Sequence, residues 1–232
     1  MDTGEAARQG GTVVFDLDGT LADTSVDLIA AANACFESRG LGCLLDPARD
    51  AGIAFHGGRA MLRAGYARLP ADTLLPPDAE DVDFPRLLAF YDDSIAISTR
   101  LYPGVKAALN RLSDDGHILT VCTNKPEGLA QKLLIALGIR DCFAALVGAD
   151  TLPVRKPDPR PYAASVTRAG GTVARSILIG DTETDLKTAR AAGVKVALVG
   201  FGPEGAGIAR LSPDALLNDF AALPALARDW LG

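Results

Sequence analysis

Apolar runs alternate with helical segments through the second half of the chain, and this alternation constrains the fold more than any other feature. The apolar runs that predict buried strands are 117–122, 144–147, 176–179 and 195–199. Helical spacing of apolar residues predicts helices over 105–114, 127–137, 162–169 and 185–192. Strands and helices that alternate with short connections form right-handed βαβ units around a parallel sheet. We therefore expect an α/β fold with a Rossmann-like parallel sheet.

One further strand is expected near the start of the chain, at Thr12–Phe15, well apart from this series. The interval that follows it has helical patterning and no convincing strand. Prolines break this interval into pieces, at Pro70, Pro76, Pro77 and Pro85. A connection of roughly 75 residues needs structure of its own. We expect residues 1–22 and 98–232 to form the α/β catalytic core and residues 23–97 to form an inserted, all-helical cap domain.

The composition of the 232-residue chain excludes several classes of function. Its formal net charge is −6 and no concentrated basic face is visible, so nucleic acid is not an expected partner. No stretch approaches the roughly 20 apolar residues that span a bilayer, so no membrane association is expected. Residues 1–11 are predicted to be a frayed polar leader without the apolar centre of a signal peptide. The chain could be a monomer or a homodimer.

Four cysteines are scattered along the chain, at Cys35, Cys43, Cys122 and Cys142. They show no C-x-x-C pairing and no histidine cluster, which argues against a zinc site. In a chain without a signal peptide, such cysteines are typical of buried thiols in a cytoplasmic protein.

The first strand ends in Asp16-Leu17-Asp18-Gly19-Thr20. This places two carboxylates and free backbone amides at the carboxyl edge of the sheet, where open α/β folds keep their chemistry. Two like charges so close together need compensation, and Mg²⁺ prefers carboxylate oxygens. The same residues would also suit a surface turn. A calcium-binding loop is less compatible, because the third acidic ligand and the closing glutamate are missing.

Three later strands also end in residues that carry chemistry. They are followed by Thr123-Asn124, by Lys156 in an Arg-Lys-Pro-Asp-Pro turn, and by Gly180-Asp181 with Asp185 four residues after Asp181. Each segment alone has an ordinary explanation, as a helix cap, a rigid surface loop or an acidic first turn. If the strand ends lie side by side, the segments assemble carboxylates, a hydroxyl, an amide and a lysine in one crevice.

Together these four segments resemble the motifs of the haloacid dehalogenase-like hydrolase superfamily, in order and over nearly the whole chain. A helical cap inserted after the first motif is similar to the subfamily that contains phosphoglycolate phosphatase and β-phosphoglucomutase. Residues 16–24, DLDGTLADT, are especially similar to the phosphoglycolate phosphatase group.

The resemblance implies a phosphatase mechanism that uses an aspartyl-phosphate. Asp16 would attack phosphorus. Asp18 would protonate the leaving oxygen and then activate water. Dehalogenases resemble this pattern without the second aspartate, so Asp18 favours phosphate chemistry.

The resemblance also implies a ligand set. Mg²⁺ would be held by Asp16, the backbone carbonyl of Asp18, and Asp181. Phosphoryl oxygens would be bound by Thr123, Asn124 and Lys156. Asp185 would support the metal-bound waters or orient Lys156.

The substrate is expected to be a small phosphorylated metabolite, with 2-phosphoglycolate favoured. In this family the cap sets specificity, and Arg59 could pair with a substrate carboxylate. A solvated Arg59 at a helix start is the alternative. Another sugar or small-metabolite phosphate remains open, as does a β-phosphoglucomutase-like phosphomutase with His56 as its base. A non-catalytic phospholigand-binding protein and a receiver-like domain are further alternatives that the motifs favour less.

Overall fold

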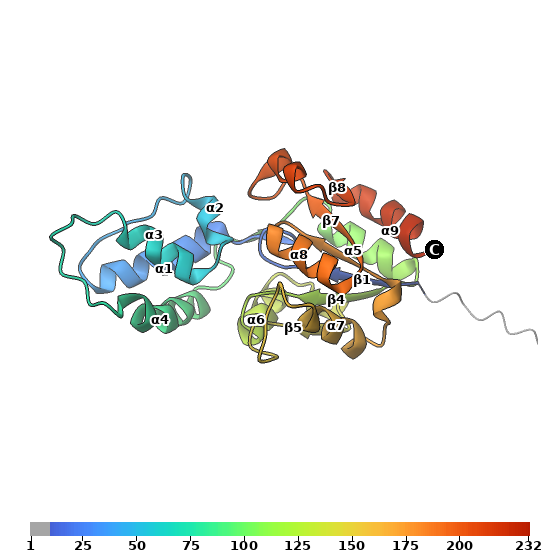
Figure 1. The fold of residues 1–232 in the computed structure, drawn as a ribbon, viewed down its shortest axis with the longest axis horizontal. Helices are drawn as coiled ribbons and strands as arrows, with labels where there is room; N and C mark the ends of the chain where they lie inside the picture. Colours follow the sequence, from blue (N-terminus) through green and yellow to red (C-terminus); the bar gives the residue numbers. More distant parts are fainter. Residues whose placement is uncertain (1–9) are drawn as a thin grey trace, which may run out of the picture. The chain divides into compact units, whose positions relative to one another are not determined.

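The computed structural model describes residues 10–232, which form two compact units (Figure 1). One unit is Ala22–Leu101, and the other joins the chain up to Leu21 with Tyr102–Gly232. A two-stranded antiparallel ladder of β2 (Ala22–Asp23) and β3 (Arg100–Leu101) lies at the two ends of the smaller unit. The boundaries therefore lie beside this ladder, rather than after residues 22 and 97. The sequence pattern does not reveal the ladder because each strand has only two residues.

The larger unit is built on a six-stranded sheet in which all neighbouring strands are parallel. Its strands are β1 (Thr12–Phe15), β4 (Ile118–Cys122), β5 (Ala145–Val147), β6 (Ser176–Gly180), β7 (Lys195–Val199) and β8 (Ala215–Leu217). They are arranged in the order β5-β4-β1-β6-β7-β8, which confirms the Rossmann-like sheet. The order reverses between β1 and β6, so this is the point where such sheets bind ligands.

Helices pack on both faces of this sheet. They are α5 (Val105–Asp114), α6 (Glu127–Ala136), α7 (Pro159–Arg168), α8 (Glu183–Ala192) and α9 (Leu223–Leu231). The helices α7 and α8 contact each other and the sheet, and α5 and α9 do the same. Tyr162 on α7 belongs to a buried apolar cluster with Val14, Leu178 and Val196 from three central strands. Because β1 is buried on both faces, its sequence is apolar without alternation.

The predicted strands and the helices between them are present, with ends that shift by a few residues. The described part of the chain adds β8 and α9, which the apolar pattern did not indicate. Residues 10 and 11, expected to fray, are held in place, since Gly10 N donates to Gly116 O (3.1 Å) and Gly11 O accepts from Ile118 N (3.1 Å). The rest of the predicted leader, residues 1–9, lies outside the described residues.

The smaller unit contains four helices besides its ladder. They are α1 (Ser25–Ser38), α2 (Ala51–Ala54), α3 (Gly58–Tyr66) and α4 (Ala79–Asp93). Pro85 lies inside α4, so the expectation that it breaks the helical interval at this position is wrong. The helix continues because its packing contacts offset the lost hydrogen bond: Leu87 is buried, and the fully buried Asp83 accepts hydrogen bonds from Arg39 at 2.5 and 2.9 Å.

All four cysteines are free, and only two of them match the expected burial. Cys35 and Cys122 are buried, whereas Cys43 is exposed and Cys142 is partly exposed, because these two lie on loop or 3₁₀ segments at the surface. Among the described residues, no helix has both the length and the apolar character that a bilayer crossing requires.

Candidate active site

Three neighbouring strands deliver the predicted site residues to one edge of the sheet. Asp16 follows β1, Thr123 follows β4 and Asp181 follows β6, and these strands lie side by side in the order β4-β1-β6. Asp16 N donates to Ile179 O of β6 at 2.9 Å, so the ladder continues to the first residue of the site. Asp16 and Asp181 thus lie on the two sides of the point where the strand order reverses.

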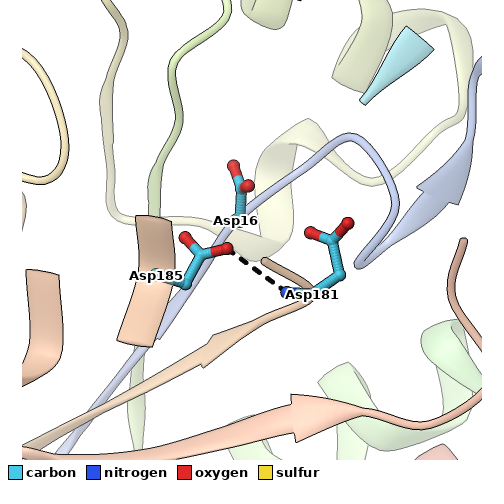
Figure 2. Close-up of side chains that lie close together, drawn as sticks. All are labelled: Asp16, Asp181 and Asp185. Atoms are coloured by element: carbon cyan, nitrogen blue, oxygen red, sulfur yellow. Dashed lines mark hydrogen bonds between the residues drawn. The ribbon is translucent and has the colours of Figure 1, made fainter. Parts of the chain in front are cut away.

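Three buried carboxylates gather at this edge (Figure 2). Asp16, Asp181 and Asp185 each offer an oxygen within 4.8 Å of the others. Asp16 Oδ1 and Asp181 Oδ2 are buried and accept no hydrogen bond. Such buried acceptors are unfavourable unless a positively charged group compensates for them. The donor set, made of hard carboxylate oxygens, is the kind that a divalent cation such as Mg²⁺ prefers.

The electrostatics of Asp16 and Asp181 agree with this interpretation. Burial, with the charges of Asp185 and Asp18, raises the pKa of Asp16 to about 6 although Lys156 opposes the shift. Burial, followed by the charges of Asp185 and Asp16, raises the pKa of Asp181 well above its usual value. The ionised forms therefore need a nearby positive charge.

Lys156 supplies part of that charge from the segment before α7. Its side chain is buried, and Nζ lies 2.6 Å from Asp185 Oδ1 and 3.1 Å from Asp16 Oδ1. Burial lowers the pKa of Lys156, but the charges of Asp16 and Asp185 raise it by a larger amount. The net shift is upward, so the ammonium form is favoured. The peptide bond to Pro157 is cis, and Asn124 Nδ2 donates to Lys156 O at 3.0 Å. The side chain of Asn124 thus contacts the loop that carries the lysine.

Asp185 is fixed by the first turn of α8. Its Oδ2 accepts from Thr182 Oγ1 (2.7 Å), Thr182 N (3.1 Å) and Asp181 N (3.3 Å), which includes the helix capping box. Its Oδ1 accepts from Lys156. Gly180 makes room for this arrangement, because a Cβ there would lie 2.4 Å from the carboxylate carbon of Asp185. Both oxygens of Asp185 are therefore engaged within the protein.

Asp18 is paired with a lysine that the sequence interpretation did not assign. Lys125 Nζ lies 2.9 Å from Asp18 Oδ1 and 3.0 Å from Oδ2. The signal was its position directly after Thr123-Asn124 at the end of a strand, but nothing in the local pattern relates it to Asp18. Thr123 Oγ1 accepts from the N–H of Lys125 at 3.2 Å, so these residues share one tight loop.

The first backbone amide of α6 is capped by a residue from a neighbouring loop. Glu127 N donates to Asp150 Oδ1 at 2.8 Å, so a side chain from the neighbouring loop caps this amide. An anion at this edge would therefore meet the Thr123–Lys125 loop rather than the Glu127 amide.

Arg59 belongs to the smaller unit, on α3, and its contacts there are with acidic residues. Its guanidinium bonds Asp81 Oδ1 (2.7 Å) and Glu80 Oε1 (3.2 Å) and lies over the Phe84 ring, 4.6 Å from the centroid. His56 Nδ1 lies 2.9 Å from Gly52 O. The Arg59 side chain is 40% exposed, and a substrate carboxylate would have to compete with Asp81 and Glu80 for its guanidinium.

The charged groups at the sheet edge do not balance. The carboxylates are Asp16, Asp18, Asp181 and Asp185, and the ammonium groups are Lys125 and Lys156. With all four carboxylates ionised, two positive and four negative charges give a formal charge of 2 − 4 = −2, which one divalent cation would neutralise.

Comparison with known proteins finds relatives that match this chain over most of its length. A phosphoglycolate phosphatase of Mesorhizobium japonicum is 38% identical, covering 91% of this chain and 92% of its own, and one of Agrobacterium fabrum is 39% identical, covering 92% and 91%. A solved structure described as a predicted phosphoglycolate phosphatase from Haemophilus somnus 129pt superposes with a TM-score of 0.82 at 28% identity, covering 94% and 98% of the two chains. The model of the haloacid dehalogenase-like hydrolase family matches residues 13–199. This chain therefore belongs to the haloacid dehalogenase-like hydrolase family.

Proposed function

We propose that this protein is a Mg²⁺-dependent phosphatase that hydrolyses a small phosphomonoester through an aspartyl-phosphate, with 2-phosphoglycolate as the favoured substrate. The observation that carries the proposal is the buried Asp16, whose Oδ1 accepts no hydrogen bond and lies 3.1 Å from the ammonium of Lys156 at the reversal point of the sheet. The names of the curated relatives support phosphate ester chemistry.

Asp16, Asp181 and the backbone carbonyl of Asp18 would hold the cation. Two buried oxygens that accept no hydrogen bond, Asp16 Oδ1 and Asp181 Oδ2, and the formal charge of −2 at the sheet edge support this assignment. When bound, Mg²⁺ would polarise a phosphoryl oxygen and neutralise the charge among the carboxylates. Asp185, whose two oxygens are engaged, would keep Lys156 in place rather than bind the metal directly.

In the first step, a carboxylate oxygen of Asp16 attacks phosphorus, and the bond from phosphorus to the alcohol oxygen breaks. Asp18 gives its proton to that oxygen, so an alcohol leaves instead of an alkoxide. In the second step, Asp18 takes a proton from water as the water oxygen attacks phosphorus. The bond from phosphorus to Asp16 then breaks, which releases phosphate and restores the carboxylate.

The remaining residues would bind the phosphoryl group. Lys156 touches Asp16 and would neutralise charge on the nucleophile and on the phosphate together. Thr123 and Asn124, on the loop after β4, would hold phosphoryl oxygens.

The first experiment measures phosphate release from a panel of phosphomonoesters, with Mg²⁺ and with EDTA, for wild type and Asp16→Asn. We expect a metal-dependent activity that is strongest on 2-phosphoglycolate and is lost in the variant. Asp141→Asn, an exposed carboxylate of the same unit, is the matched control and should retain activity. Borohydride reduction during turnover should convert residue 16 to homoserine, which mass spectrometry detects.

The outcomes separate the parts of the proposal. Activity spread over sugar phosphates would contradict the substrate and keep the mechanism. Activity that persists in Asp16→Asn would contradict the nucleophile. If no substrate of the panel releases phosphate and the protein instead isomerises a sugar phosphate in the presence of a sugar bisphosphate, the protein is a phosphomutase and not a phosphatase.

Arg59 is the candidate determinant of substrate choice. If it binds the substrate carboxylate, Arg59→Ala should raise KM for 2-phosphoglycolate about tenfold or more and leave KM for ethyl phosphate unchanged. Arg63→Ala is the control, because Arg63 also pairs with Glu80, at 3.1 Å. If the two variants raise KM for 2-phosphoglycolate equally, Arg59 only stabilises the smaller unit and does not bind the substrate carboxylate.

A further inference from the structure

Lys125 is a second buried lysine at the sheet edge, and the mechanism above gives it no role. Its side chain is 4% exposed, and its ammonium donates to both oxygens of Asp18, at 2.9 and 3.0 Å. Two charge-assisted hydrogen bonds to one carboxylate restrain both its position and the orientation of its plane. The Asp18 side chain is itself 18% exposed, so it lies at the edge of the site where a substrate can reach it.

The backbone of Lys125 is held on both sides. Its N–H donates to Thr123 Oγ1 at 3.2 Å, and its carbonyl oxygen accepts from Ala149 N at 2.9 Å. The next loop packs closely here, because a Cβ at Gly148 would lie 2.8 Å from Lys125 O. The ammonium therefore reaches Asp18 from a fixed backbone, which is the arrangement that a positioning group requires.

We propose that Lys125 is a positioning residue for Asp18, which it holds in the orientation needed to exchange protons with the leaving oxygen. This inference rests on the proposed function, because it requires Asp18 to be the general acid. A misplacement of about 1 Å can lower a rate by roughly 10²-fold. Substitution of Lys125 should therefore slow only those reactions in which the leaving oxygen needs a proton from Asp18.

The leaving group provides the test. Ethyl phosphate releases an alkoxide that needs a proton, whereas acetyl phosphate, of similar size, releases acetate without one. We expect Lys125→Met to lower kcat/KM for ethyl phosphate by about 10- to 100-fold and for acetyl phosphate by less than about threefold. Lys125→Arg should recover part of the loss. Lys132→Met, at an exposed lysine on α6, is the control and should change neither value.

An equal loss on the two substrates would overturn the proposal, because it would assign Lys125 to phosphate binding or to folding. Circular dichroism and thermal melting establish that each variant folds. If Lys125→Met does not fold, Lys125→Gln keeps a hydrogen-bond donor, and the same selective loss is expected at smaller size. An unselective loss in that variant would overturn the proposal equally.

Asp18→Asn separates this inference from the proposed function. If Asp18→Asn is itself unselective between the two substrates, the general-acid role of Asp18 fails and the role of Lys125 fails with it. If Asp18→Asn is selective and Lys125→Met is not, only the role of Lys125 fails. In the double variant, kcat/KM for ethyl phosphate should equal that of Asp18→Asn, and multiplicative losses would contradict a shared role.

Discussion

Asp185→Asn tests whether the capping carboxylate of α8 holds the lysine of the site. In the wild type, Oδ1 faces Lys156 Nζ at 2.6 Å, and Oδ2 faces three donors from Asp181 and Thr182 at 2.7–3.3 Å. An amide has one acceptor atom and one NH₂ group. Whichever way it is turned, its NH₂ faces either the ammonium or the three donors, so at least one buried donor loses its partner.

The size of the effect follows from these contacts. A buried donor without its partner costs about 1–3 kcal/mol, and breaking a buried ion pair costs about 3–5 kcal/mol. Lys156 retains Asp16 at 3.1 Å, so the ion pair is only half broken. We expect the free energy of unfolding of the α/β unit to fall by about 2–4 kcal/mol.

Urea denaturation followed by tryptophan fluorescence measures this change. Trp230 is the single tryptophan of the chain and lies on α9, so its signal reports on the α/β unit. EDTA is included so that cation binding does not mask the loss. Asp141→Asn, at an exposed site, should change the unfolding free energy by less than about 0.5 kcal/mol. A loss under about 1 kcal/mol for Asp185→Asn, at an unchanged urea slope, would refute the reasoning.

Three further predictions follow from single contacts. Gly180→Ala places a Cβ 2.4 Å from the capping carboxylate of α8, so it should lower the unfolding free energy by about 1–3 kcal/mol in urea denaturation and reduce phosphate release. Gly128→Ala is the control, because a Cβ there would have no atom within 4 Å. An equal loss of stability in this variant would contradict the steric argument. Hydrogen bonds from Arg68 hold the pKa of Asp50 at about 2, so the pair stabilises the folded state above about pH 4 and loses this effect as pH falls toward 2. Arg68→Met should remove about 1–2 kcal/mol at pH 7 and flatten acid unfolding, and an unchanged acid midpoint would count against it. Burial raises the pKa of Asp16 to about 6, so metal-free protein should lose stability as pH rises from about 4 to 6, and Asp16→Asn should weaken this dependence. Thermal melting with and without Mg²⁺ across this range provides the check.

Five strands of the central sheet could be predicted because they are buried on both faces, and such strands have mostly apolar sequences without alternation. β8 and α9 were not predicted, since β8 is three residues long and only partly buried. The prediction of a break at Pro85 was wrong because it considered only the local effect of proline on a helix. It did not include the burial of Asp83 and Leu87 in the same helix.

The acidic motifs determined the family and the candidate residues, because their residue types and spacing are local properties of the chain. The partners of those residues were decided only by the tertiary structure. Lys125 and Asp18 are 107 positions apart, and Thr20 bonds Asp181 across 161. Likewise, Asp150 caps Glu127 from another loop. Parallel strands bring such distant segments to one edge of the sheet, and no pattern in either segment alone records which side chains meet there.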